Sequence, residues 1–272
     1  MNNIDYDANP QEYRAKPGVT QSQLKHLSRS PAHFKYACEH PITPTPAMEF
    51  GTLVDHLFFG TPFKWVESAF DDFRSKEAKA WREDQERTGT TVFKPATIAE
   101  ARAVIDSLMR RNAVKELLQA GSAQVAMYAD MEGVHCKGLP DWICSDQALI
   151  VDLKTTGKQA AAVFSVGDID YTDGADFART IINLGYDVQA AFYLDMFKVI
   201  TGEDMDWRWI VAEVEPPYEV AVWAATPQII ERGRRIYKQR LATYRACLEA
   251  GEWPGYPDKC QFVQLPAWAL PK

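Results

Sequence analysis

The pattern of apolar and polar residues predicts a group of strands in the middle of the chain, with helices on both sides. Short apolar runs at residues 123–130, 134–144 and 148–156 are separated by turn residues, as in consecutive antiparallel strands. Two later runs, 207–214 and 218–224, predict a second pair of strands joined at two prolines. We therefore expect a three-stranded antiparallel meander, followed by a helix and two further strands.

Apolar residues that recur every three or four positions predict the helices. They cover residues 20–34, 48–59, 95–120, 177–199 and 227–250. Thr20 is followed three positions later by Gln23, which is the spacing of a capping box at a helix start. Ser30 and Pro31 predict a break in the first helix, because proline removes a helical hydrogen bond.

In two segments the apolar residues show no clear periodicity. Residues 63–95 are highly charged with scattered aromatic side chains, and they predict a helical segment with solvated faces. Residues 157–175 contain several aspartates without the ligand positions of a calcium loop, so they predict a surface loop. We expect one α/β domain with a mainly helical part at 1–120, a sheet and helix at 121–225, and a helix and tail at 226–272.

Composition limits the class of protein. Apolar residues make up 46% and charged residues 25% of the 272 residues, as in a soluble globular protein. No apolar run is long enough to cross a bilayer, and the first residues do not resemble a signal peptide, so we expect a cytoplasmic protein with no membrane partner. Five cysteines without a C-x-x-C pair argue against a zinc ribbon or a disulfide scaffold.

The candidate chemistry centres on residues 139–156, where Asp141 and Asp152 flank a predicted turn and Lys154 follows. Residues i and i+2 of a strand share a face, so Asp152 and Lys154 point the same way while Leu153 points into a core. Two carboxylates and an ammonium group on one face suit a hard divalent cation such as Mg²⁺. A lone D-x-K triplet is more often a surface salt bridge, so the assignment depends on the rest of the chain.

Further candidate residues lie on the predicted helices, and each has a structural alternative. His56 interrupts an apolar helix, either as a structural histidine or as a metal ligand through a neutral ring nitrogen. Gln189 and Tyr193 lie four positions apart on one helical face, either as a buried polar pair or as part of the site.

The start of the first helix also has two interpretations. Thr20, Ser22 and Arg29 belong either to a capped structural helix or to a position where backbone N–H groups, hydroxyls and a cation bind a phosphate. The sequence alone does not choose between them.

These residues together carry a resemblance to a known family. The turn flanked by Pro140–Asp141 and Asp152–Leu153–Lys154 resembles the signature of the PD-(D/E)xK nuclease superfamily. With His56, Gln189 and Tyr193 in this order, the opening YDANPQEYRAKPGVTQSQLKHLSRSP and the closing EWPGY and LPAWA, the chain resembles the RecE-like (exonuclease VIII) domain over nearly its whole length. More distantly, it is similar to phage lambda exonuclease, through Gly18–Ser22.

The resemblance implies a fold and a set of roles. The fold is a restriction-endonuclease-like α/β core, with a central mixed sheet flanked by helices. Its metal ligands are His56, Asp141, Asp152 and the Leu153 carbonyl, which hold one or two Mg²⁺ ions that Mn²⁺ can replace. Lys154 positions or deprotonates the attacking water, while Gln189 and Tyr193 contact the phosphate, the lysine or the DNA backbone. Thr20, Ser22 and Arg29 bind the 5′-phosphate of the DNA.

The resemblance also implies an activity. It is a Mg²⁺-dependent 5′→3′ exonuclease on linear double-stranded DNA, which releases mononucleotides and leaves a 3′ single-stranded overhang for recombination. Members of this family act as homotrimeric rings on double-stranded DNA ends, with a single-strand annealing protein of the RecT or Bet type as partner. One departure concerns the metals: the family often has a glutamate where this chain has Gln124.

Other classes of function stay open. The chain could be a structure- or sequence-directed endonuclease of the same superfamily, or a non-catalytic protein that binds DNA ends. The net charge of −7 requires that any DNA contact use a local group of cations. Residues 227–250 form the most basic predicted element, for which we rank a solvated face first, a subunit contact second and a DNA backbone contact third.

Overall fold

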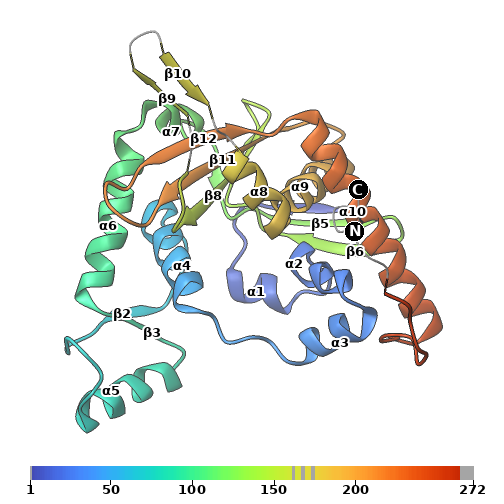
Figure 1. Ribbon diagram of the computed structural model, residues 1–272, viewed down its shortest axis with the longest axis horizontal. Coiled ribbons are helices and arrows are strands. Elements are labelled where there is room, and N and C mark those ends of the chain that lie inside the picture. Colours follow the sequence, from blue (N-terminus) through green and yellow to red (C-terminus); the bar gives the residue numbers. More distant parts are fainter. Residues whose placement is uncertain (1, 161–162, 167–168, 173–174, 264–272) are drawn as a thin grey trace.

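The computed structural model describes residues 2–160, 163–166, 169–172 and 175–263 (Figure 1). The helices are α1 (Pro10–Ala15), α2 (Gln21–Leu24), the 3₁₀ helix η1 (Lys25–Ser28), α3 (Pro31–Glu39), α4 (Pro46–Phe59), α5 (Lys76–Arg87), α6 (Pro95–Arg110), α7 (Asn112–Leu117), α8 (Ala175–Leu184), α9 (Tyr186–Thr201) and α10 (Pro227–Ala250). The strands are β1 (Asn3–Asp5), β2 (Trp65–Glu67), β3 (Thr91–Phe93), β4 (Ser122–Ala123), β5 (Ala126–Met131), β6 (Val134–Gly138), β7 (Trp142–Cys144), β8 (Leu149–Thr156), β9 (Val163–Val166), β10 (Ile169–Thr172), β11 (Asp206–Glu213) and β12 (Val220–Ala224).

A five-stranded mixed sheet with the order β12-β11-β8-β7-β4 is the centre of the molecule. Strand β8 runs parallel to β11 and antiparallel to β7, and it places Asp152 opposite Trp209. The predicted hairpin of β7 and β8 and the predicted strands β11 and β12 are confirmed. The mixed sheet flanked by helices is also confirmed.

The two faces of this sheet belong to two apolar cores. Val151 and Leu153 of β8 pack with residues of α4 and α6 on one face. Ile150 lies on the other face, in the core that contains α9 and α10. This alternation places Asp152 on the α9 face, and Figure 1 shows α4 and α6 on one side of the sheet with α9 and α10 on the other.

The predicted three-stranded meander is wrong. Strand β5 pairs with β1 and β6 in a separate sheet, while β7 belongs to the central sheet. The chain leaves β6 at Gly138, where an added Cβ would lie 2.7 Å from the Tyr193 ring. The predicted strand at 134–144 is therefore two strands, β6 and β7, which lie in different sheets.

Two other predictions need correction, and one is confirmed. The predicted helix at 177–199 is interrupted at Gly185, whose φ of +75° ends α8 and begins α9. The predicted loop at 157–175 contains the strand pair β9–β10, although residues 161–162, 167–168 and 173–174 lie outside the described ranges.

The capping box is present, because the Thr20 hydroxyl accepts from the Gln23 N–H and the Gln23 side chain accepts from the Thr20 N–H.

The predicted helical segment at 63–95 holds one helix and a strand pair. Strands β2 and β3 run parallel and α5 lies between them in the chain. Figure 1 shows this arm extending away from the central sheet.

The N-terminal segment is fastened to both edges of the small sheet. Strand β1 pairs with β5, and Val19 forms a parallel bridge with Cys136 of β6. Lys137 is 8% exposed, and its Nζ donates to the carbonyls of Tyr13 at 3.0 Å and Lys16 at 2.6 Å. Within the ranges given above, no helix has the length and apolar character needed to cross a membrane.

Candidate active site

Strand β8 brings Asp152 and Lys154 together in a buried position. Asp152 is 1% exposed, and Lys154 Nζ donates to its Oδ1 at 2.9 Å and lies 2.7 Å from its Oδ2. Burial raises the pKa of Asp152, and the neighbouring ammonium group opposes that shift. Burial acts to lower the pKa of Lys154, but the Asp152 and Asp141 carboxylates raise it above its usual value. Lys154 is therefore a protonated cation at neutral pH.

Asp141 immediately precedes β7, beside the part of β8 that extends beyond its pairing with β7. Its Oδ2 accepts a hydrogen bond of 2.9 Å from the Leu153 N–H. Because the N–H and C=O of one strand residue point to the same neighbouring strand, the Leu153 carbonyl also points toward Asp141. The pKa of Asp141 lies well above its ordinary value, through burial first and then through repulsion from Asp152 and Asp55.

Asp55 is a member of this cluster that the sequence did not single out. Helix α4 presents it from the opposite side of the sheet, close enough to Asp152 and Asp141 for mutual repulsion. Its pKa is raised to about 7 by burial, with Lys154 lowering it and Asp152 raising it. The signal in the sequence is a carboxylate within the apolar run MEFGTLVDHLFFG.

His56, its neighbour, has different surroundings. Its Nδ1 contacts the Thr61 carbonyl, and its ring makes edge contacts with Phe63 and Trp65. These contacts are those of a structural histidine. A role as metal ligand stays a prediction.

Helix α9 supplies three side chains to the same site. Gln189 Nε2 donates to Asp152 Oδ1 at 3.0 Å, so it holds the carboxylate rather than the lysine. The ring of Tyr186 lies 4.8 Å from Lys154 Nζ, a cation–π contact that the sequence did not suggest. Burial raises the pKa of Tyr193 to about 12, although a backbone hydrogen bond from Leu139 opposes the shift.

A cavity of about 350 Å³ leads to this cluster. Its lining includes Asp55, Gln124, Leu139 and Tyr13. Gln124 has a positive φ of 46°, and its N–H donates to the Asp141 carbonyl at 3.0 Å. Gln124 therefore lies beside the carboxylates, at the position where the resemblance expects a glutamate.

The ligand type of this cluster suits a divalent cation, whereas the number of side-chain ligands is small. A cation would relieve the repulsion of Asp152 on Asp55 and Asp141, and carboxylate and carbonyl oxygens are the ligands that Mg²⁺ prefers. Among the described residues, no group of three or more His, Cys, Asp or Glu side chains could hold a metal ion. Mg²⁺ sites commonly use only one or two carboxylates, with water and substrate phosphate as the other ligands.

The residues expected at the DNA 5′-phosphate lie apart from this cluster. Thr20 Oγ1 is 3.0 Å from Ser22 Oγ and accepts from the Gln23 N–H at 3.2 Å, so both hydroxyls belong to the cap of α2. Arg29 is exposed and its side chain makes no hydrogen bond or ion pair within the described part of the chain. Phosphate binding by these residues stays a prediction.

Comparison with known proteins places the chain in a family. A family described as PDDEXK-like domain of unknown function (DUF3799) matches residues 20–266. The structure of a proposed exonuclease from Eubacterium rectale is similar, with a TM-score of 0.64, 17% identity and 96% of each chain covered. A phage-related exonuclease from Haemophilus somnus 129PT also matches, with a TM-score of 0.35, 11% identity, and 89% of this chain and 100% of that chain covered. No curated protein sequence matches this chain. This protein is a member of the PDDEXK-like domain family DUF3799.

Proposed function

We propose that this protein is a divalent-metal-dependent exonuclease that degrades double-stranded DNA from its 5′ ends. The observation that carries the proposal is the buried contact of Asp152 with Lys154 and Gln189, beside the carboxylates of Asp141 and Asp55. Burying three acids and a lysine lowers the stability of the folded protein. Such a buried cluster is therefore a candidate functional site, with a role such as binding a cation and a phosphate. The name of the Eubacterium rectale relative supports the choice of exonuclease.

The side chains have separable roles in this proposal. Asp141, Asp152 and the Leu153 carbonyl would hold Mg²⁺, with Asp55 beside them. A bound Mg²⁺ would lower the pKa of a water molecule and offset charge on the scissile phosphate. Lys154 is protonated, so it orients that water or stabilises negative charge rather than removing a proton. Gln189 fixes the Asp152 carboxylate, and Tyr186 covers the ammonium group.

The finer properties rest on the resemblance to RecE-like exonucleases. They are 5′→3′ polarity, release of mononucleotides, a 3′ overhang, a homotrimeric ring and a single-strand annealing partner. Recognition of the 5′-phosphate by Thr20, Ser22 and Arg29 belongs to the same group of proposals.

The test is digestion of linear duplex DNA that carries a label at either the 5′ or the 3′ end. We expect early release of the 5′ label with Mg²⁺ and no release with EDTA. Early release of the 3′ label would keep the nuclease and remove the proposed polarity.

Closed circular DNA and two variants serve as controls. Nicking of closed circles would favour an endonuclease, because an exonuclease needs a free end. Asp152→Asn and Lys154→Met are expected to retain the fold and DNA binding but to lose cleavage by several orders of magnitude, since each removes a charge from the reacting site. Binding of DNA ends by the wild-type protein without any cleavage would favour a non-catalytic end-binding protein.

A further inference from the structure

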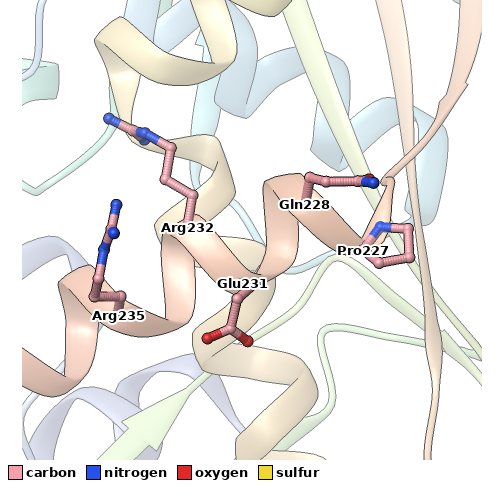
Figure 2. A pocket seen from close by; sticks show the side chains of 5 residues that line it. All are labelled: Pro227, Gln228, Glu231, Arg232 and Arg235. Carbon is pink, nitrogen blue, oxygen red and sulfur yellow. The ribbon is translucent and has the colours of Figure 1, made fainter.

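Helix α10 carries a hollow of about 490 Å³ outside the candidate active site. It is lined by Pro227, Gln228, Glu231, Arg232 and Arg235. Figure 2 shows the side chains of Arg232 and Arg235 extending from α10 to the same side, while the Glu231 carboxylate points away from them. Two guanidinium groups that face one hollow make it a candidate site for an anion.

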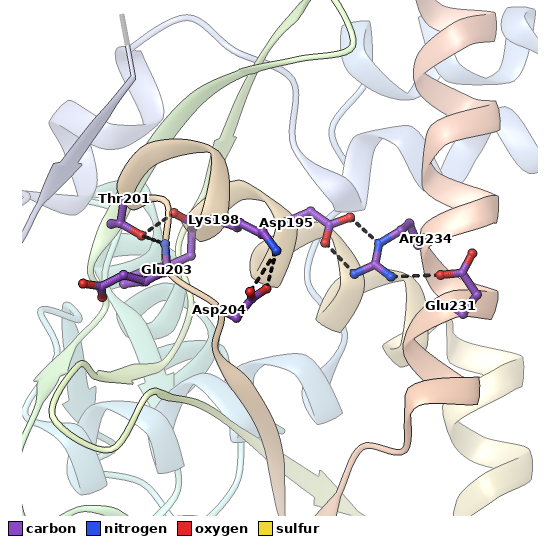
Figure 3. A network of polar contacts seen from close by, with 8 residues as sticks. Asp195, Lys198, Thr201, Glu203, Asp204, Glu231 and Arg234 are labelled. Atoms are coloured by element: carbon purple, nitrogen blue, oxygen red, sulfur yellow. Dashed lines mark hydrogen bonds and ion pairs between the residues drawn. The ribbon is translucent and has the colours of Figure 1, made fainter.

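The carboxylate of Glu231 is already paired with another arginine. Arg234 Nη1 donates to Glu231 Oε2 at 2.9 Å, and two other nitrogens of the same guanidinium lie 2.7 Å from the two Asp195 oxygens (Figure 3). Asp195 also accepts from the Tyr237 hydroxyl at 2.5 Å. Glu231 therefore pairs with Arg234 rather than with Arg235.

The two arginines of the hollow differ in their partners. Arg232 pairs with Asp187, which is 0% exposed, and keeps 36% of its own side chain exposed. Arg235 is exposed and has no hydrogen-bond or ion-pair partner among residues that the structure describes. Among the described residues, Arg235 therefore presents an unpaired guanidinium group beside the Arg232–Asp187 ion pair, in a chain whose net charge is −7.

The hollow is connected to the active site through the start of α9. Asp187, the partner of Arg232, follows Tyr186, whose ring contacts Lys154. Lys25 of η1 donates to the Leu184 carbonyl at 3.0 Å, and η1 packs against α10. Leu184 and Asp187 are three positions apart and therefore at most about 11 Å from each other. Lys25 and Arg232 thus hold the same short segment.

We propose that the hollow at Arg232 and Arg235 binds the phosphodiester backbone of the nucleic-acid substrate, at a phosphate away from the one that is cleaved. Arginine suits this task because its planar donors match phosphate oxygens. Phosphate contacts carry no sequence information, so we expect this binding to be independent of sequence. This inference rests on the proposed function and adds the surface that holds the substrate.

The test is binding of a short fluorescent linear duplex by wild-type protein, Arg235→Gln and Arg235→Lys, in EDTA over a series of salt concentrations. Arg235→Gln is expected to bind about three- to tenfold more weakly, with the slope of log K against log salt reduced by about 0.9. Arg235→Lys keeps the charge and is expected to keep most of the salt slope. Asp187 keeps its partner in both variants, so neither leaves a buried charge unpaired.

Arg74 supplies a matched control, since its side chain is 92% exposed on the distant α5 arm. Arg74→Gln is expected to bind as the wild type does. Wild-type affinity and salt slope in Arg235→Gln would overturn the inference, and so would equal losses in Arg74→Gln. Binding in EDTA does not depend on cleavage, so a loss specific to Arg235 would stand even if the wild-type protein cleaved no DNA.

Discussion

Asp55 and His56 are neighbours on α4 with opposite surroundings. Asp55 raises the pKa of Asp141, and Asp152 raises the pKa of Asp55, whereas His56 packs against Phe63 and Trp65. We expect Asp55→Asn to lower metal-dependent cleavage about 10- to 100-fold, the usual loss when a group that supports a metal site is removed. His56→Gln is expected to stay near wild-type activity. Cleavage rates across a Mg²⁺ titration would compare the two, and the reverse ranking would restore His56 as the ligand.

The raised pKa of Asp55 also predicts a dependence of stability on pH. An unfolded aspartate has a pKa of about 3.9, while that of folded Asp55 is about 7, so between these values the folded state binds more protons. The free energy of unfolding should therefore fall as the pH rises through this interval. Melting temperatures in EDTA are expected to decline from pH 5 to pH 8 in wild type, and less steeply in Asp55→Asn. Parallel curves would mean that Asp55 is not the group responsible.

At this scale, the sequence predicted the pair on β8 but not the whole cluster. Asp152 and Lys154 could be placed together because a strand repeats every two residues, whatever surrounds it. Asp55 could not be chosen over His56, because neighbours on a helix point about a quarter-turn apart and only the packed structure decides which one faces the sheet. Tyr186 was missed because its contact with Lys154 depends on where Gly185 ends one helix and begins another.

Helices α9 and α10 approach each other closely at Gly233. A Cβ added to Gly233 of α10 would lie 2.0 Å from the Asp187 carbonyl oxygen. Glycine to alanine inside a helix is normally stabilising, but here we expect Gly233→Ala to destabilise by about 1–3 kcal/mol, because backbone must move away from backbone. Activity should fall too, since α9 carries Gln189 against Asp152.

Denaturant unfolding would measure this loss against a second glycine. Within the described part of the chain, a Cβ added to Gly157 would meet no atom within 4 Å, so Gly157→Ala is expected to change stability little. A Gly233→Ala protein as stable as the wild type would show that the two helices are less closely packed than described.

Elements with a strong local signal were predicted well, and their partners were not. Helix α10 and strands β8 and β11 follow from periodicity alone. Strands β5–β6 and β7–β8 lie in two different sheets. At the end of β6, Gly138 lies against the Tyr193 ring, and a contact between residues so far apart in the sequence is not visible in a local pattern. The pair β9–β10 was missed although the sequence carries a signal for it, because the runs VFSV and IDYT are separated by Gly167 and Asp168, as in a two-residue hairpin.

Across the whole molecule, the two apolar cores share the strands β8 and β11. Neither core can lose its contacts without uncovering a face of the same sheet, so we expect one cooperative unfolding transition, as for a single domain. Tryptophan fluorescence and far-ultraviolet circular dichroism should give the same midpoint in urea, because Trp207 and Trp209 are buried residues of β11 in the central sheet. Two separate midpoints would show that the mainly helical part at 1–120 unfolds independently.

The attachment of the N-terminal segment has a consequence for how the protein is made. Tyr13 is held by Lys137, which follows it by 124 positions, and β1 and Val19 also depend on strands β5 and β6. At about 5–20 residues per second, a ribosome needs on the order of 6–25 s to add the residues that lie between them. For that time Tyr13 and Val19 lack the strand that they contact in the folded protein, and the segment around them is available to chaperones and proteases. The synthesis of β6 therefore sets the earliest moment at which Tyr13 and Val19 can make these contacts.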